Sequence, residues 1–487
     1  MTDAEAAQRR KWLALALLAS TQFVIILDAA IVNVAIPSIG DDLSFSEEDL
    51  TWIPNAYALT FGGFLLLGGR MADLLGRRRL FMIGLLVFSV ASLLGGLSTS
   101  ETQLIIARAA QGLGAALLAP SALSMVTNMF EEGAERNKAL GVWGAVSGSG
   151  GAAGVLLGGI LTEYAGWEWV LWVNVPIGVI VAILAPRLLV ESRRESDLRH
   201  FDALGAITVT AGLSLLVFAL VDTINDGWGS TQTLTLLAVA LALIVAFVFI
   251  ELRSKDPLMP FGIFRLRTLS GANIVGLLVG AALFAMFFFL SRYMQEVLGY
   301  SALKAGLSYL PLALAIIASA GAASVLVTKL GFKKVLLAGL GLITVGLLWF
   351  AQVPANGSYL SDLLGPMVIS AVGLGFAFVP ITIAAVSNVS EDESGLASGL
   401  INTSQQIGGA LGLAVLGTIA SSRTTDLLTT AQGAPAGIPA ALTEGFQLAF
   451  LTGAGFAVIG IVATLLLVRS EDSQAVVGAS PAELPMA

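Results

Sequence analysis

A single acid, Asp28, lies deep inside a long apolar stretch near the start of the chain. Uncharged residues run from Trp12 to Leu27 before it and from Ala29 to Gly40 after it. A carboxylate near the centre of a bilayer helix costs about 2.5–3.5 kcal/mol on insertion scales, so a chain that keeps one there is expected to use it. The residue type and its position therefore predict a site that carries a proton or binds a cation.

Arg108 is a second charge within an apolar stretch, at residues 103–129. A guanidinium inside a membrane helix is stable only where it faces a cavity or pairs with an acid or with carbonyl groups. Asp28 is one possible partner, although the sequence does not show which helix faces meet. The two residues together are the candidates for proton coupling.

The remainder of the chain has the composition of a membrane protein. Of its 487 residues, 56% are hydrophobic and 12% are charged, whereas soluble domains carry about 25% charged residues. Apolar runs long enough to cross a bilayer must be helices, because open strands leave backbone groups unsatisfied in lipid. Fourteen such runs are predicted, at 12–37, 51–69, 80–98, 103–129, 139–161, 169–188, 203–222, 232–250, 269–290, 304–327, 335–353, 361–387, 396–420 and 446–468.

The distribution of basic residues predicts the orientation of these helices. With both termini in the cytoplasm, the inner segments hold 21 of the 25 Lys and Arg residues, and the outer segments hold only Arg292, Lys304 and Arg423. This segregation follows the positive-inside rule and would be lost with an odd number of spans. We therefore expect a multi-pass protein of the cell (cytoplasmic) membrane with both termini in the cytoplasm.

No pattern in the chain indicates an enzyme or a metal site. The sequence has no cysteine, which excludes disulfides and thiolate metal ligands, and His200 is a lone histidine in a charged segment. It has no Gly-rich phosphate loop and no nucleophile with a suitably spaced base. We therefore expect no catalytic residue, no metal, no cofactor and no nucleic-acid partner, and the proton motive force as the energy source.

Short sequence patterns recur in the two halves of the chain. An A-x-G pattern followed by G-G-A-x-G begins at Ala139 and again, with the same spacing, at Ala397, 258 positions later. A second pattern, L-G-x followed by two basic residues, begins at Leu75 and again at Leu330. Repeats in the same order imply a duplicated unit, and parallel repeats are a known plan for transporters that bind substrate between two halves.

The fourteen predicted helices then divide as six, two and six. The predicted units are a six-helix bundle at 1–188, a charged linker with two inserted helices at 189–267, a second six-helix bundle at 268–470 and a cytoplasmic tail at 471–487. Asp28 has no acidic counterpart in the second half, so we expect the coupling chemistry in the first half. The inserted pair could seal the halves against lipid or bind a partner.

The loop between the second and third helices carries a specific pattern of glycines and charges. Its glycines permit a tight turn, and its acid can cap a helix or pair with arginine. The pattern resembles the loop signature of the major facilitator superfamily, at Gly69, Asp73, Gly76, Arg77 and Arg78. The fourth helix resembles that superfamily as well, at Arg108, Gln111, Gly112 and Gly114. The resemblance implies an all-α polytopic fold of two six-helix bundles, here with two inserted helices, and a gating role for the loop residues.

A narrower resemblance is to the fourteen-span drug:proton antiporters, and it covers the chain from Lys11 to Arg469. It implies that Asp28 exchanges protons and that Arg108 modulates this exchange. The matching positions are Asp28, Asn33 and Pro37 in the first helix, Trp52 and Tyr57 in the second, Trp167, Trp169 and Asn174 to Gly178 at the sixth, and Gly395 to Gly399 with Asn402 and Gln405 in the thirteenth.

The fifth helix is rich in glycine, which lets neighbouring helices approach closely. In the antiporters that this chain resembles, such a pattern is the antiporter signature, which implies a gating role, although Val155 stands where a proline is usual. Plain helix packing would also explain these residues. The helix also contains Gly151, and the glycines predicted to have the gating role are Gly150, Gly154, Gly158 and Gly159.

Polar and aromatic residues within the spans are candidates for a substrate cavity. Polar groups in lipid need partners, but hydrogen bonds between helices would explain them equally, and phenylalanines often face lipid. The candidates are Asn33, Trp52, Asn55, Tyr57, Gln111, Phe288, Tyr293, Asn402 and Gln405.

These features together predict a monomeric antiporter that exports lipophilic small molecules, neutral or monovalent cations, in exchange for protons. Its partners are then the lipid bilayer, protons and the exported compound. A dedicated exporter of an endogenous metabolite, lipid, siderophore or antibiotic would use the same parts. A nutrient uptake symporter would be expected to place more polar groups in the second half, and a membrane receptor would not need Asp28 and Arg108.

Overall fold

The structure is a computed structural model that describes residues 3–45, 50, 52–192, 202–254, 257–430, 437–475 and 477. His200 and, in the predicted tail, residues 476 and 478–487 lie outside the described residues. Helices dominate the part of the chain that is described, and no strand occurs in it.

The helices follow the chain in two series separated by a pair. The first series is α1 (Asp3–Leu43), α2 (Trp52–Leu75), α3 (Arg77–Gly96), α4 (Glu101–Met129), α5 (Ala134–Tyr164), α6 (Trp169–Trp172) and α7 (Asn174–Leu188). The pair is α8 (Ala203–Asp226) and α9 (Thr231–Glu251). The second series is α10 (Arg267–Arg292), α11 (Ala302–Ser308), α12 (Leu310–Leu330), α13 (Phe332–Phe350), α14 (Leu364–Val386), α15 (Ser394–Thr430), α16 (Ile438–Leu467) and α17 (Ser470–Ala475).

Thirteen helices of the described chain are long and apolar enough to cross a membrane. The fourteenth predicted span, 396–420, lies within α15, which is 37 residues long. It is not among the thirteen, and its first third carries a run of polar residues from Asn402 to Gln406 that lowers the hydropathy of the helix. The predicted all-α polytopic fold is confirmed.

Several helix ends differ from the predicted spans. The first prediction, 12–37, was too short, because α1 continues from Asp3 to Leu43. The prediction at 169–188 is divided into α6 and α7 at Val173. An apolar run in the sequence marks only the part of a helix that lies within the hydrocarbon core of the membrane. The helix can continue into the hydrated regions on either side, where polar residues are tolerated.

A single glycine connects two helices at equivalent places in the two series. Gly76 joins α2 to α3 with φ of 106°, and Gly331 joins α12 to α13 with φ of 85°. Positive φ is readily adopted only by glycine, so the sharp turn requires this residue. The two glycines are 255 positions apart, which is the offset between the repeated patterns of the sequence.

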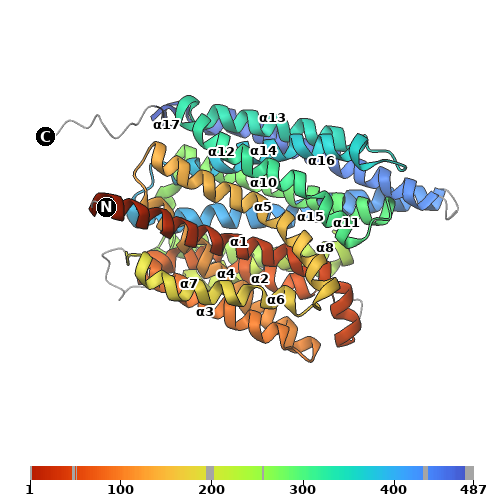
Figure 1. The fold of residues 1–487 in the computed structure, drawn as a ribbon, viewed down its shortest axis with the longest axis horizontal. Coiled ribbons are helices and arrows are strands. Elements are labelled where there is room, and N and C mark those ends of the chain that lie inside the picture. Colours follow the sequence, from red (N-terminus) through yellow and green to blue (C-terminus); the bar gives the residue numbers. More distant parts are fainter. Residues whose placement is uncertain are drawn as a thin grey trace.

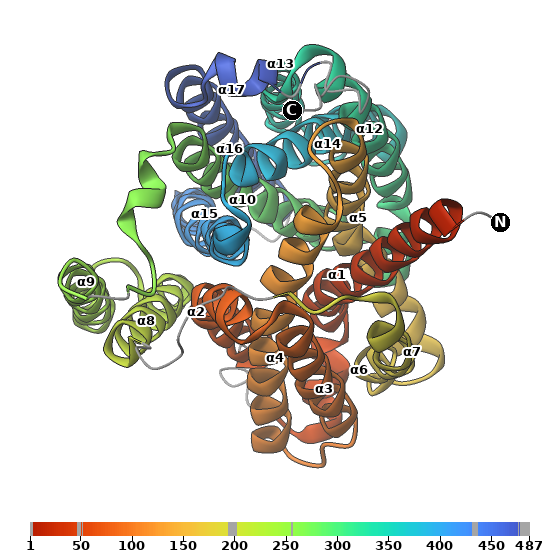
Figure 2. The same ribbon diagram turned by 90° about the vertical axis from the view of Figure 1, so that its left-hand side faces the viewer.

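The helices lie roughly along one axis, and both ends of the described chain are at the same end of the bundle, called here the termini end (Figure 1). The first series and the second series meet along two seams, α5 with α12 and α15 with α2. Figure 2 shows α8 and α9 at one side of the bundle, next to α2. The first of these two helices packs against α2, α9 and α15.

Candidate functional site

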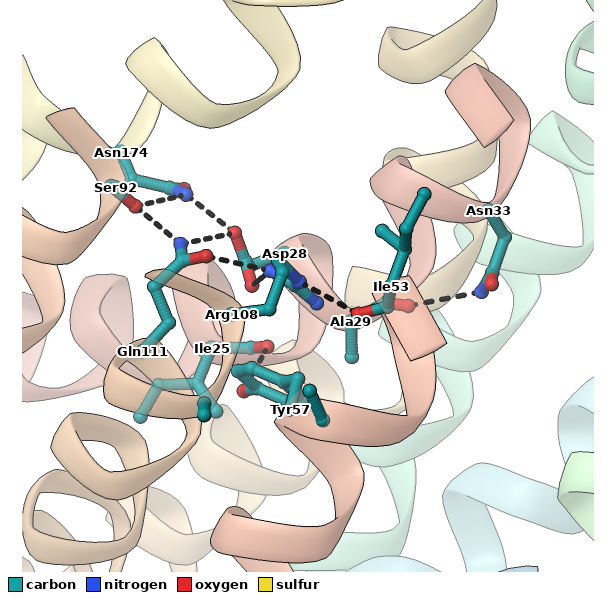
Figure 3. A network of polar contacts seen from close by, with 12 residues as sticks. Ile25, Asp28, Ala29, Asn33, Ile53, Tyr57, Ser92, Arg108, Gln111 and Asn174 are labelled. Carbon is teal, nitrogen blue, oxygen red and sulfur yellow. Dashed lines mark hydrogen bonds and ion pairs between the residues drawn. The ribbon is translucent and has the colours of Figure 1, made fainter. Parts of the chain in front are cut away.

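Asp28 and Arg108, the two charged candidates for proton coupling in the predicted membrane spans, form a buried ion pair in the first series of helices. Arg108 on α4 donates from Nη1 to Oδ2 of Asp28 on α1 at 2.6 Å (Figure 3). The side chain of Asp28 is 0% exposed and that of Arg108 is 1% exposed. An ion pair at this depth is well shielded from salt, and neither charge can be removed without leaving the other buried and uncompensated.

The second carboxylate oxygen of Asp28 is held by two carboxamides. Gln111 Nε2 donates to Asp28 Oδ1 at 3.1 Å, and Asn174 Nδ2 donates to the same atom at 2.6 Å. Both amides also contact Ser92 Oγ on α3, at 2.5 and 3.0 Å. Figure 3 shows these side chains converging on Asp28 from α3, α4 and α7. The carboxylate thus joins α1 directly to α4 and α7, and through the two amides to α3.

The guanidinium of Arg108 has further partners besides Asp28. Its Nε donates to the carbonyl oxygen of Ile53 at 3.2 Å, and Nη1 also contacts Gln111 Oε1 at 2.9 Å. The guanidinium carbon lies 4.6 Å from the centroid of the Tyr57 ring, in the range of a cation–π contact. The Tyr57 hydroxyl donates to Ile25 O on α1 at 3.3 Å. Arg108 therefore links α1, α2 and α4.

Two members of this network, Asn174 and Ser92, were not predicted as site residues. Asn174 belongs to the sequence match at the start of α7, and the residue is 1% exposed. A polar residue at the start of an apolar helix is a usable signal, since a buried amide needs partners. Ser92 gave no such signal, because a serine in an apolar helix commonly bonds its own backbone.

Asn33, the remaining predicted polar residue of α1, does not join the network. Its Nδ2 donates to the carbonyl of Ala29 on the same helix at 3.0 Å, and in Figure 3 it lies apart from Asp28. Of the predicted substrate residues, only Tyr57 and Gln111 lie at the Asp28 network.

The other predicted substrate residues are dispersed over the bundle. Trp52 stacks on Phe218 of α8, with ring centroids 5.5 Å apart. Tyr293 is buried and donates to the carbonyl of Pro354, and Asn402 donates to Ser398 of its own helix. Phe288, with 38% of its surface exposed, packs edge-on against Phe289. Asn55 and Gln405 are half-buried.

The glycines of α5 bring this helix against the helix that carries Asp28. A Cβ atom on Gly154 would lie 2.8 Å from both the carbonyl oxygen of Leu27 and the Cβ of Ala30. Cβ atoms on Gly150 and Gly158 would also lie within 3 Å of α1, at Ile26 and Ile31. Side chains here would push α1 away from α5, so the glycines fix the position of α1. Gly159 is also buried on α5.

Replacing Gly154 with alanine is expected to lower transport activity at least tenfold, because the new Cβ requires the backbone beside Asp28 to shift. The matched control is Gly151→Ala on the same helix, where a Cβ would meet no atom within 4 Å. Transport rates and the amount of folded protein would be measured for both variants. Equal activity of the two would show that the close approach is not needed.

The predicted loop signature lies at the termini end and contacts the second series. Asp73, at the end of α2, accepts from Arg77 Nη2 at 2.9 Å. It also accepts from the backbone N–H groups of Gly395 and Leu396 at 3.0 Å each. These N–H groups open α15, where unpaired donors and the helix dipole favour a negative charge. Asp73 therefore caps a helix of the other half.

The other loop residues support this contact. A Cβ on Gly69 would lie 2.4 Å from the carbonyl of Gly395, so glycine is required for the close approach of α2 to α15. Glu191 accepts from the backbone N–H groups of Arg78 and Arg79 at 3.1 and 3.0 Å, which caps α3 within the first half. Gly76 supplies the turn between α2 and α3.

The second seam is joined at the same end of the bundle. Asn137 of α5 donates from Nδ2 to Thr328 of α12 at 3.0 Å, and Ser324 donates to the carbonyl of Asn137 at 2.9 Å. Ser124 of α4 and Ser394 of α15 contact through their hydroxyls at 2.6 Å. In this conformation polar contacts therefore hold the two halves together at the termini end.

Replacing Asp73 with asparagine is expected to favour the conformation that is open at the termini end. The ratio of open to closed protein should rise by roughly 10–100-fold, because hydrogen bonds to charged groups are worth about 1.5–3 kcal/mol and 1.36 kcal/mol corresponds to a factor of ten. The measurement is the rate of maleimide labelling at Thr328→Cys in the opposite seam. Glu191→Gln is the control, because Glu191, in the segment after α7, caps α3 of the first half and does not join the two halves. Similar labelling in both variants would contradict the role of Asp73.

Comparisons with known proteins agree with this architecture. The family described as Major Facilitator Superfamily matches residues 18–413. Puromycin resistance protein pur8 of Streptomyces alboniger is 37% identical over 469 residues, 96% of this chain and 93% of that protein. Cephamycin export protein CmcT of Amycolatopsis lactamdurans is 42% identical over 415 residues, 85% of each chain.

Solved structures show the same fold. The crystal structure of the human organic anion transporter MFSD10 (TETRAN) matches with a TM-score of 0.65 over 95% of this chain and 100% of that chain. The identity is 15%, so the likeness concerns the fold alone. The extent of the family match and the antibiotic exporters among the relatives settle the broader class: this chain is a multi-pass membrane transporter that belongs to the major facilitator superfamily.

Proposed function

We propose that the protein is a proton-coupled antiporter that exports lipophilic small molecules across the cytoplasmic membrane, with Asp28 as the proton carrier. The observation that carries the proposal is the buried pair of Asp28 and Arg108. Well-packed apolar residues often stabilise a protein as much as a buried ion pair does, so the presence of the pair favours a role beyond stability.

Protonation of Asp28 changes the bonding of several helices together. The ionised carboxylate accepts N–H groups from Arg108, Gln111 and Asn174. A neutral carboxylic acid has an O–H that needs an acceptor, and it no longer balances the charge of Arg108. Because a buried charge without a partner costs several kcal/mol, the protonated state favours movement of α1 relative to α4 and α7.

The contacts between the halves determine which side of the membrane is closed during the transport cycle. We assign the termini end to the cytoplasm, since most basic residues fall there in the predicted topology. The conformation closed by Asp73 at this end is then the one in which Asp28 takes up a proton from outside. Rocking of the halves opens the cytoplasmic end, where Asp28 releases its proton as the exported compound binds.

The proton motive force is sufficient for this work. One proton that moves down 100 mV supplies about 2.3 kcal/mol. Since 1.36 kcal/mol corresponds to a factor of ten, a neutral compound can be concentrated about 50-fold per proton. A monomer contains all of these parts, and the mechanism uses no other energy source.

The exported compounds are proposed to be lipophilic and neutral or singly charged. Asp28 is the sole acid deep in a predicted span, so a divalent cation would have no second carboxylate to balance its charge. The names of the relatives favour a second candidate, because those of pur8 and CmcT each refer to a single antibiotic or antibiotic class. A dedicated exporter of one such metabolite would use the same mechanism.

Transport into inverted membrane vesicles tests the proposal. A lipophilic monovalent dye should accumulate when the vesicle interior is acidified and should leave when an ionophore collapses the gradient. A panel that adds a divalent dye and several antibiotics separates a general drug exporter from a dedicated one. Accumulation that is independent of the proton gradient would refute proton coupling, and proton-driven movement in the opposite direction would indicate an uptake symporter.

A further inference from the structure

The inserted helix α8 contacts both halves of the transporter. It lies beside α2 of the first half and packs also against α15 of the second half (Figure 2). The seam between α2 and α15 must change when the halves rock. Helix α8 therefore has to follow one half and move relative to the other, and its two contact surfaces differ in kind.

The surface between α8 and α2 interlocks through glycine. A Cβ on Gly63 would lie 1.8 Å from Ser214 Oγ and 3.2 Å from Ser214 Cα, so the two backbones are in close approach. Gly62 lies beside Val217, with 3.3 Å between its ideal Cβ position and Cγ2. Interdigitated helices cannot slide without lifting side chains out of the grooves that hold them.

The loop after α9 is fastened to the same half. Glu251, 3% exposed at the end of α9, accepts from the backbone N–H groups of Leu258 and Met259 at 3.2 and 3.0 Å. Arg70 of α2 donates to the carbonyl of Pro257 in this loop at 3.1 Å. The pair is thus held to α2 along α8 and again at the termini end.

In the part of the chain that the structure describes, the surface between α8 and α15 is apolar and is not interlocked by glycines. Leu396, Ala397 and Leu400 of α15 share an apolar cluster with α8 residues such as Val209 and Leu213. Close approaches by glycines of α15 are made to α2, at Gly395 and Gly399, and to α10, at Gly408, Gly409 and Gly412. Apolar contact of this kind is non-directional, so it permits sliding.

Among the described residues, a side-chain hydrogen bond crosses this sliding surface at the other end of the bundle. Trp228, between α8 and α9, donates from Nε1 to Thr418 Oγ1 of α15 at 2.9 Å. A single bond of this kind is worth about 0.5–1.5 kcal/mol, which is small beside the energy of a transport step.

We propose that α8 and α9 move as one body with the first half and slide along α15 when the transporter changes conformation. The inserted pair then covers the α2 and α15 seam in both conformations and keeps lipid out of it. The hydrogen bond between Trp228 and Thr418 breaks in each cycle. The inference rests on relative motion of the two halves and not on which compound or ion is exported.

Distances between spin labels test this directly, because the chain has no native cysteine. Three exposed positions report the three bodies: Ile207 on α8, Leu86 on α3 of the first half and Leu466 on α16 of the second half. Three double-cysteine variants would be spin-labelled: Leu86 with Leu466 (the 86/466 pair), Ile207 with Leu86 (the 207/86 pair) and Ile207 with Leu466 (the 207/466 pair). The distance between the two labels of each pair would be measured in nanodiscs, in acidic and basic buffer, with and without an exported dye. The 86/466 pair identifies the conditions under which the halves move.

The expected result under those conditions is an unchanged 207/86 distance and a shifted 207/466 distance. A shift of the 207/86 distance would overturn the proposal. An 86/466 distance that never changed would also overturn the proposal, because the two halves would then not move relative to each other. Loss of proton coupling in a transport assay, with these distances behaving as expected, would overturn only the proposed function.

Cross-linking gives a functional readout of the same motion. A disulfide between Gly62→Cys and Val217→Cys joins α2 to α8 and should leave transport within about twofold of the uncross-linked protein. A short bifunctional thiol reagent that joins Trp228→Cys to Thr418→Cys should arrest transport, with recovery on cleavage of the reagent. Arrest by the first cross-link, or full activity with the second, would refute the assignment of α8 and α9 to the first half.

Discussion

Replacing Asp28 with asparagine is expected to reduce proton-driven accumulation in inverted vesicles from about 50-fold to no accumulation above the outside concentration. Asparagine keeps the shape of the side chain, and its oxygen can still accept from Arg108. Its amide group faces the N–H donors of Gln111 and Asn174, so one of these carboxamides must turn over to accept from it, and the side chain cannot exchange a proton. Binding of the exported compound to purified protein should remain measurable. The variant would then bind its substrate and be unable to concentrate it.

Two controls make this result specific. Glu296→Gln removes an exposed acid that pairs with Arg292 on the surface, and it should leave accumulation unchanged. Elution of the Asp28 variant as a single folded species separates loss of coupling from loss of structure. Accumulation by Asp28→Asn at the native level, with the gradient still required, would show that another group carries the proton.

Replacing Arg108 with leucine is expected to lower the free energy of unfolding by about 3–5 kcal/mol, because Asp28 is left as an uncompensated buried charge. Adding Asp28→Asn to that variant should recover part of the loss, since no unpaired charge then remains. Transport should stay abolished in the double variant. The measurement is a double-mutant cycle. The free energy of unfolding in mixed micelles is determined for the native protein, both single variants and the double variant.

The result that would contradict this prediction is simple additivity. If the double variant were destabilised by the sum of the single effects, Asp28 and Arg108 would not interact energetically. Their 2.6 Å contact predicts instead a coupling of well over 1 kcal/mol.

The sequence predicted the membrane helices well because the cost of polar groups in lipid leaves a strong signal. Thirteen helices of the described chain are long and apolar enough to span, and the signal is weaker in α15, where Asn402 to Gln406 are polar. The division at Val173 left no mark in hydropathy, since α6 and α7 are both apolar. The grouping of the helices into bundles of six, two and six stays a prediction.

The site was predictable only in part, for a related reason. Asp28 and Arg108 stand out because a charge in a span is expensive, but their contact depends on which faces of α1 and α4 meet. Asn174 and Ser92 are uncharged, and each has several ordinary explanations in an apolar helix. Their convergence on one carboxylate oxygen, directly or through the amides, depends on the packing of α3 and α7 against α1.

The polarity of α15 has a consequence for how the protein is made. A helix with a run of polar residues such as Asn402 to Gln406 partitions poorly into lipid when it leaves the translocon alone. Its neighbours α2 and α10 precede it in the chain and are already in the bilayer when α15 is synthesised. We therefore expect docking to these helices to assist the insertion of α15, so that insertion and tertiary assembly of this segment are coupled.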